Sequence, residues 1–95
     1  MHMVRDIDRV ITELRTAYPL LVVEQLRVAH PGADDDGLWF FRHPERPGEV
    51  QLESSTGASP FLLEGDDGTP PVSVRSVEEA VALVAFRLGL AGRTA

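Results

Sequence analysis

The stretch "LWFFRHPERPGEVQLE", residues 38–53, decides the fold of this chain. Its first four residues are all apolar, whereas its last five alternate between polar and apolar side chains. Alternation with a period of two is typical of a strand that buries one face. The two prolines and the glycine of residues 43–48 interrupt this pattern, because proline has no amide hydrogen to donate to a ladder. We therefore expect two strands joined by a turn, which is a β-hairpin with a longer loop.

The segments on either side of this hairpin also predict strands. Residues 61–64 predict a short strand, and residues 72–74 predict an edge strand after a pair of prolines. Residues 21–29 are rich in β-branched side chains and predict a strand, although a helix fits this segment only slightly less well. In the strand interpretation, the side chains that share one of its faces are Val23, Gln25 and Arg27.

An amphipathic helix is predicted near each end of the chain. Apolar residues recur at spacings of three and four from Val4 to Tyr18, and the pattern stops before a proline. Ser76 and Glu79 form a capping box at the start of the second helix, and Gly89 lies where a left-handed residue ends it. Helix, three or four strands and helix, in that order, predict an α+β fold. We expect a two-layer sandwich with both helices on one face of an antiparallel meander sheet; the alternative places one helix on each face.

The composition indicates one acidic domain over residues 1–95, in which residues 1–3 are either native or the remnant of a tag and residues 90–95 fray. Fifteen acidic side chains face nine arginines, which gives a net charge of −6. Scattered arginines in an acidic chain argue against a nucleic-acid partner. The apolar runs are too short to span a membrane, and no signal peptide is recognisable, so we expect a cytoplasmic protein. Without cysteine, neither a disulfide nor a thiolate site can form.

A partner-binding surface is predicted on the sheet face that the helices leave open. If they cover Val50 and Leu52, the opposite face carries polar side chains together with Leu62. The run LWFF must divide between the two faces, which puts one alternate pair outside: Trp39 and Phe41, or Leu38 and Phe40. Aromatic anchors inside a polar rim are typical of protein interfaces. The residues predicted to bind a partner are Trp39, Phe40, Phe41, Gln51, Glu53, Leu62 and Glu64, with Val23, Gln25 and Arg27 nearby. The alternative is that a loop or the other helix covers this face.

No candidate for catalysis or metal binding has the required pattern. The hydroxyl-rich loop at residues 54–59 is followed by a proline and a strand, whereas a phosphate-binding loop opens a helix, so we interpret it as a bend. The acidic runs at 34–36 and 64–68 lack the alternating ligands of a calcium loop. His30 and His43 each precede a proline and have no ligand partner at helical spacing, which indicates surface turn residues. We expect no catalytic residue, no metal and no cofactor.

Four segments, "GLWFF" at 37–41, "VQLESSTG" at 50–57, "PFLLE" at 60–64 and "SVEEAVALV" at 76–84, resemble a group of small bacterial single-domain proteins of unknown function. Those proteins have a similar glycine–tryptophan–aromatic strand, an ESS-x-G turn and a closing amphipathic helix. The resemblance covers about half of the chain and implies a fold, without a catalytic residue. In size, charge and architecture, the chain is also similar to immunity proteins encoded beside bacterial toxins.

Together these features predict a non-enzymatic bacterial protein-binding module, accessory or immunity-like, whose acidic surface attracts a basic protein partner. One alternative is a homodimer that buries the open sheet face. The other is a small hydrolase, which would need Ser55 or Ser59 beside a histidine, either His30 or His43, to activate the hydroxyl.

Overall fold

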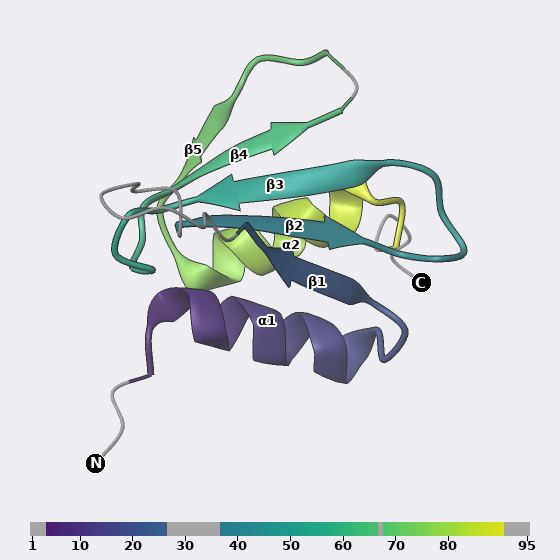
Figure 1. Ribbon diagram of the computed structural model, residues 1–95, viewed down its shortest axis with the longest axis horizontal. Helices are drawn as coiled ribbons and strands as arrows, with labels where there is room; N and C mark the ends of the chain where they lie inside the picture. The colour runs from purple at the N-terminus through teal and green to yellow at the C-terminus, as the bar shows by residue number, and fades with distance from the viewer. Residues whose placement is uncertain (1–3, 27–36, 67, 91–95) are drawn as a thin grey trace.

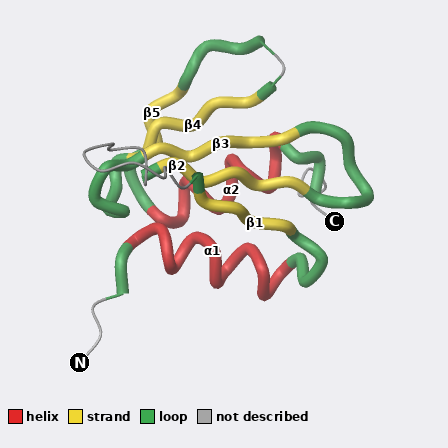
Figure 2. The backbone as a smooth tube through the Cα atoms, viewed as in Figure 1, coloured by secondary structure: helices red, strands yellow, loops and turns green. Residues whose placement is uncertain are grey.

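The computed structural model describes residues 4–26, 37–66 and 68–90. Its elements in chain order are α1 (Asp6–Ala17), β1 (Val22–Gln25), β2 (Leu38–Arg42), β3 (Glu49–Glu53), β4 (Phe61–Gly65), β5 (Val72–Val74) and α2 (Val77–Arg87) (Figure 1). The strands pair antiparallel in the order β1-β2-β3-β4-β5, which is a meander (Figure 2). The predicted α+β fold is confirmed, with five strands rather than three or four. The segment that fits both a strand and a helix forms β1, which is shorter than residues 21–29.

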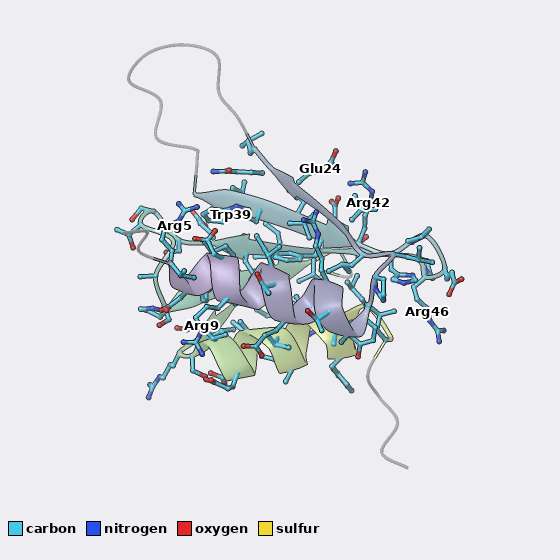
Figure 3. The ribbon with its side chains drawn as sticks, turned by 90° about the horizontal axis from the view of Figure 1, so that it is seen from below. Arg5, Arg9, Glu24, Trp39, Arg42 and Arg46 are labelled. Carbon is cyan, nitrogen blue, oxygen red and sulfur yellow. The ribbon has the colours of Figure 1, made fainter. Side chains whose placement is uncertain are left out.

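Both helices lie on the same face of the sheet, as Figure 3 shows from a direction in which the two layers separate. α1 and α2 also pack against each other. The molecule therefore has one layer of helices and one layer of strands, and the alternative with one helix on each face is wrong. This arrangement buries both helical apolar stripes against a single sheet surface.

The core lies between the two layers. Alternate side chains of β2 and β3 are buried, as the pleat of a strand requires. The strand side chains in the core are Trp39, Phe41, Val50, Leu52, Phe61, Leu63 and Val74. Those from the helices are Ile7, Val10, Leu14, Val77, Ala80, Val84, Ala85 and Leu88.

The helix ends use local hydrogen bonds. At the start of α2, the Ser76 hydroxyl oxygen accepts from the amide of Glu79 at 3.1 Å, as the capping box predicts. The Glu79 carboxylate accepts from the amide of Arg75 at 2.8 Å, one residue earlier than the ideal box. After α2, Gly89 has a φ of +76°, which agrees with its predicted role in ending the helix.

The start of α1 is closed by Arg5 and Asp8, a pair that the sequence pattern did not indicate. The amide and the Nε of Arg5 donate to Asp8 Oδ2 at 3.1 and 3.2 Å. The side-chain hydrogen bond from Arg5 lowers the pKa of Asp8, because it stabilises the charged carboxylate. The helix ends at Ala17, close to the stop predicted before Pro19.

Candidate functional site

The sheet face turned away from the helices is called the outer face. Two residues that are Cα partners on neighbouring antiparallel strands have their side chains on the same side of the sheet. The register therefore assigns each side chain to one face. The outer-face side chains are Val22, Glu24, Leu38, Phe40, Arg42, Glu49, Gln51, Glu53, Leu62, Glu64 and Ser73. Leu26, whose amide donates to the Leu38 carbonyl at 2.9 Å, extends this face beyond β1. Figure 3 shows Glu24 and Arg42 on the side of the sheet away from the helices. Among the described residues, no helix or strand covers this face.

The register divides the apolar run of β2 between the two faces. Phe40 pairs with Gln51 on the outer face, whereas Trp39 pairs with the buried Leu52. Trp39 and Phe41 are 3% and 0% exposed, so the expectation that these two side chains contribute to a surface for a partner is wrong. The Arg5 guanidinium lies over the Trp39 ring, 5.9 Å from its centre, and Figure 3 shows these two residues close together.

The other predicted residues of the surface lie where the alternation places them. Phe40, Gln51, Glu53, Leu62 and Glu64 all belong to the outer face. The two described neighbours that were expected from the first strand, Val23 and Gln25, do not belong to it. Val23 and Gln25 pair with Phe41 and Trp39, so they lie on the helix side, and Arg27 is outside the described residues. Val22 and Glu24 occupy the outer face instead, and Glu24 is the polar residue that interrupts the apolar side of the strand pattern.

The outer face has two halves of different character. The apolar half, on β1 and β2 and the residue after β1, contains Val22, Leu26, Leu38 and Phe40, and the Glu24–Arg42 ion pair interrupts it. The acidic half, on β3 and β4, consists of Glu49, Gln51, Glu53 and Glu64, with Asp66 directly after β4. Leu62 is the apolar exception in the acidic half and is 37% exposed. The boundary between the halves runs along the strands, between β2 and β3.

Arg42 is the one arginine on the outer face among the described residues. Its guanidinium pairs with Glu24 on β1 and lies 3.8 Å from a carboxylate oxygen of Glu49 on β3. The hydrogen bond from Arg42 lowers the pKa of Glu24, and the same bond raises the pKa of Arg42. All three side chains are well exposed, so these ion pairs contribute little to stability. Their effect is to reduce the negative charge of one edge of the face.

The net charge of the described residues is concentrated on the outer face. These residues include seven arginines and eleven carboxylates, which gives −4. The outer face with Asp66 holds five of the carboxylates and one arginine, which also gives −4: Glu24, Glu49, Glu53, Glu64, Asp66 and Arg42. The six arginines and six carboxylates on the rest of the described surface balance one another. Charge of one sign gathered on one face creates a directional field, which a uniform distribution would not.

Two adjoining hollows lie at the end of the acidic half. The larger, of about 380 Å³, lies between the turn that follows β2 and the C-terminal end of α2 and is lined by Pro47, Gly48, Glu49, Val50, Gly65, Asp66 and Arg87. The smaller, of about 100 Å³, is lined by Glu49, Gln51, Glu64, Gly65 and Asp66. Within the second, the Gln51 amide donates to Glu64 at 3.3 Å. Within the described ranges, no three histidine or carboxylate side chains are grouped as metal ligands.

The hydroxyl-rich loop at residues 54–59 fastens α1 to the sheet. Ser54 is buried; its hydroxyl donates to the Ala58 carbonyl at 2.7 Å and accepts from the Gly57 amide at 3.1 Å. The Gly57 carbonyl then accepts from the amide of Ile7, at 2.8 Å, in the first turn of α1. Gly57 has a φ of +80°, and an added Cβ would lie 2.9 Å from the Arg5 side chain. These bonds give the loop a structural role, as the bend interpretation expects.

A carboxylate of α1 completes this attachment. The amide and the hydroxyl of Ser59 both donate to Asp6 Oδ2, at 2.8 and 2.7 Å. The backbone bond from Ser59, followed by its side-chain bond, lowers the pKa of Asp6 because both bonds favour the charged form. The Ser59 hydroxyl therefore lies beside an acid that holds it, and not beside a histidine.

Replacing Asp6 with alanine is expected to destabilise the protein at neutral pH and to have little effect in acid. Because folding lowers the pKa of Asp6, its contribution is present above the ordinary aspartate pKa near 4 and is lost as the pH falls through the lowered value. Chemical denaturation of the wild type and of Asp6→Ala between pH 7 and pH 2 measures this. In the double variant Asp6→Ala/Ser59→Ala, the two effects should not add, because both remove the same contact. A difference that stays constant with pH would contradict the assignment.

His43 is at the opposite end of β2 from this loop. The residue is 8% exposed, so the expectation of a surface histidine is wrong. Its Nδ1 accepts from the amide of Glu45 at 3.1 Å, and this hydrogen bond stabilises the turn. Ser54 follows β3, whose last residue pairs with Leu38 at the start of β2. The histidine and the serines are therefore separated by the length of the strand, on the order of 15 Å. His30, the other base in the hydrolase alternative, lies outside the described residues.

The chain matches no protein-family model, and no curated protein and no solved structure is significantly similar to it. The resemblance to small bacterial proteins therefore stays a prediction. In the described parts of the chain, no helix has both the length and the apolar character needed to cross a membrane. The geometry defines a two-layer α+β protein in which no described element covers one sheet face; this face is mainly apolar on β1 and β2 and mainly acidic on β3 and β4.

Proposed function

We propose that this protein is a non-enzymatic binding module, accessory or immunity-like, that holds a basic protein partner on its outer face in the cytoplasm. One observation carries the proposal: the outer-face side chains and Asp66 beside them carry a net charge of −4, as much as all the described residues together, and no described element covers this face. The same face exposes apolar side chains that could be buried on association. Apolar anchors supply binding energy, and surrounding charges supply steering and specificity.

Phe40 and Leu62 are the anchors that the geometry favours. Phe40 lies between Glu24 and Gln51 in one row of the outer face, and Leu62 lies opposite Glu53 in the next. Each apolar side chain thus has a polar or charged neighbour across the ladder. A partner that covers both can bury apolar area and pair with the flanking carboxylates at the same time.

The homodimer alternative is less favourable on this face. A two-fold axis perpendicular to the strands would bring the acidic halves of the two copies together, and among the described residues Arg42 is the one cation on the face that could compensate their charge. A two-fold axis parallel to the strands would place each acidic half on an apolar half. Both arrangements leave carboxylates buried without partners, which costs several kcal/mol for each charge. A basic partner avoids this cost.

Charge reversal on the outer face is expected to abolish partner binding. A matched pair of variants tests this: Glu53→Lys/Glu64→Lys on the outer face, and Glu13→Lys/Glu78→Lys on the helix layer, with equal changes in net charge. A protein from cells of the source organism should be retained by the wild type and by the helix-layer variant, and lost from the outer-face variant. With that partner purified, the association rate should fall at least tenfold in the outer-face variant and should fall with salt in the wild type.

Arg42→Gln provides the opposite change on the same face. It removes the one arginine that the described residues place on this surface, so the association rate for a basic partner should rise, and most at low salt. Equal binding by both charge-reversal variants would refute a role for the outer face. A dimer seen by light scattering that dissociates in Phe40→Ser would favour the homodimer instead.

A further inference from the structure

We infer that the partner presents a basic amphipathic α-helix, which lies along β2 and β3 with its apolar side over the apolar half and its basic side over the acidic half. This inference rests on the proposed function and specifies the kind of partner that fits. It starts from the division of the outer face: the apolar side chains of β1 and β2, interrupted by the Glu24–Arg42 ion pair, lie beside the carboxylates of β3 and β4, so the boundary follows the strand direction. A ligand that matches both halves must carry two parallel stripes.

The spacing of the two stripes matches one helix. Adjacent strands are about 4.8 Å apart, so side chains on β2 and β4 are separated by about 10 Å. That is the diameter of a helix with its side chains, about 10–12 Å. A single helix above β3 can therefore place apolar side chains toward Phe40 and basic side chains toward Glu64. One extended strand presents a single column of side chains to the sheet and cannot cover both halves.

The length of the face also fits a short helix. Along β3, Glu49, Gln51 and Glu53 cover two intervals of two residues each, which is about 14 Å. A helix covers this distance in about nine residues, or between two and three turns. Arginine or lysine side chains at the i, i+4 and i+7 positions of such a helix recur on one side and can reach Glu49 and Glu53 in succession.

A helix on the outer face would give the sheet a third layer. The inner face is already covered by α1 and α2, and sheets with helices on both faces are a common architecture. Neither α1 nor α2 of a second copy, the two helices of the described residues, supplies the required helix. α1 buries its apolar residues in its own core, and α2, which exposes Phe86, carries Glu78 and Glu79 near its start rather than basic side chains. We therefore expect the helix to come from a different protein.

Two peptides of about 14 residues with identical composition test this inference. In the patterned peptide, leucines form one helical stripe and arginines the neighbouring stripe; in the scrambled peptide, the same residues have no helical period. Fluorescence anisotropy measures the dissociation constant of each labelled peptide for the full chain. We expect the patterned peptide to bind at least tenfold more tightly. Phe40→Ser should remove this preference, Glu53→Lys/Glu64→Lys should weaken both peptides, and Glu13→Lys/Glu78→Lys should change neither.

The outcomes separate the two proposals. If both peptides bind equally, or if neither binds, the helix inference is wrong. The proposed function would still stand if the partner captured from cells is lost from the outer-face variant, and a partner that packs a sheet on this face would then be favoured. If capture from cells is unaffected by the outer-face variant, the proposed function fails whatever the peptides do. Circular dichroism of each variant ensures that a loss of binding is not a loss of fold.

Discussion

Replacing Trp39 with alanine is expected to lower the free energy of unfolding by about 4 kcal/mol. The side chain is 3% exposed, opposes Leu52 across the ladder and contacts the core formed with both helices. Removing it leaves a cavity among side chains that α1, β1 and β3 hold in place, so the site cannot collapse fully. A loss of this size is a large fraction of the stability of a small domain, about 5–15 kcal/mol. Urea denaturation followed by circular dichroism measures it.

Phe40→Ala is the matched control for this substitution. Phe40 is the next residue of the same strand, but its side chain is on the outer face and only partly buried. Its loss should cost about 1 kcal/mol, typical of a partly exposed position, while weakening the association of a partner. The two neighbours thus separate stability from binding. A Trp39→Ala protein as stable as Phe40→Ala would contradict the register described for β2 and β3.

Replacing Gly37 with alanine is expected to lower the free energy of unfolding by about 3 kcal/mol. A Cβ built on Gly37 would lie 2.2 Å from the carbonyl oxygen of Ser54, a backbone atom that no change of side-chain rotamer can move away. The Gly37 carbonyl also accepts from the amide of Ser54 at 2.8 Å, so separating the two strands breaks that bond. For a domain of this size, the melting temperature should fall by roughly 12–24 °C.

Gly68→Ala distinguishes this steric effect from the general cost of replacing a glycine. Gly68 has a φ of +85°, and nothing lies within 4 Å of its added Cβ, so its substitution carries only the cost of a left-handed backbone, about 1–2 kcal/mol. Gly37 shows the reverse combination, a close backbone approach without a positive φ. If the two variants melt at the same temperature, the close approach of Gly37 to Ser54 does not exist in solution.

The outer face conflicts with what stability alone would favour. Glu49, Glu64 and Asp66 line one hollow, where like charges repel, and Phe40 and Leu62 keep apolar surface in contact with water. The remaining charges of the described surface are balanced, and no buried side-chain polar atom in the described residues lacks a hydrogen-bond partner. Residues that a stable fold alone would not favour, when they are grouped in one place, are characteristic of functional sites. This contrast supports the outer face as the place where the protein binds.

Much of the candidate site follows from the alternation of β3. Once helices cover Val50 and Leu52, the pleat places Gln51 and Glu53 outside, and the pairing with β4 extends the same face to Leu62 and Glu64. The sheet face that carries Glu24 could not be predicted in this way. Residues 21–29 fit a helix almost as well as a strand, and a carboxylate is compatible with both interpretations. The ion pair between Arg42 and Glu24 could not be predicted either, because these residues are 18 positions apart in the chain.

Both helices, the hairpin of β2 and β3 and their order along the chain follow from the sequence, because periodicity, prolines and capping residues act within a few positions. The sequence left residues 21–29 open between a strand and a helix, and pairing with β2 makes β1 a strand. Tertiary structure decided which side of β2 faces the helices: the run LWFF has no alternation, so only its register with β3 assigns Trp39 to the core and Phe40 to the surface. Tertiary structure also decided where the charge lies. Carboxylates scattered from Glu24 to Asp66 meet on one face because a meander brings distant positions of a chain to neighbouring strands.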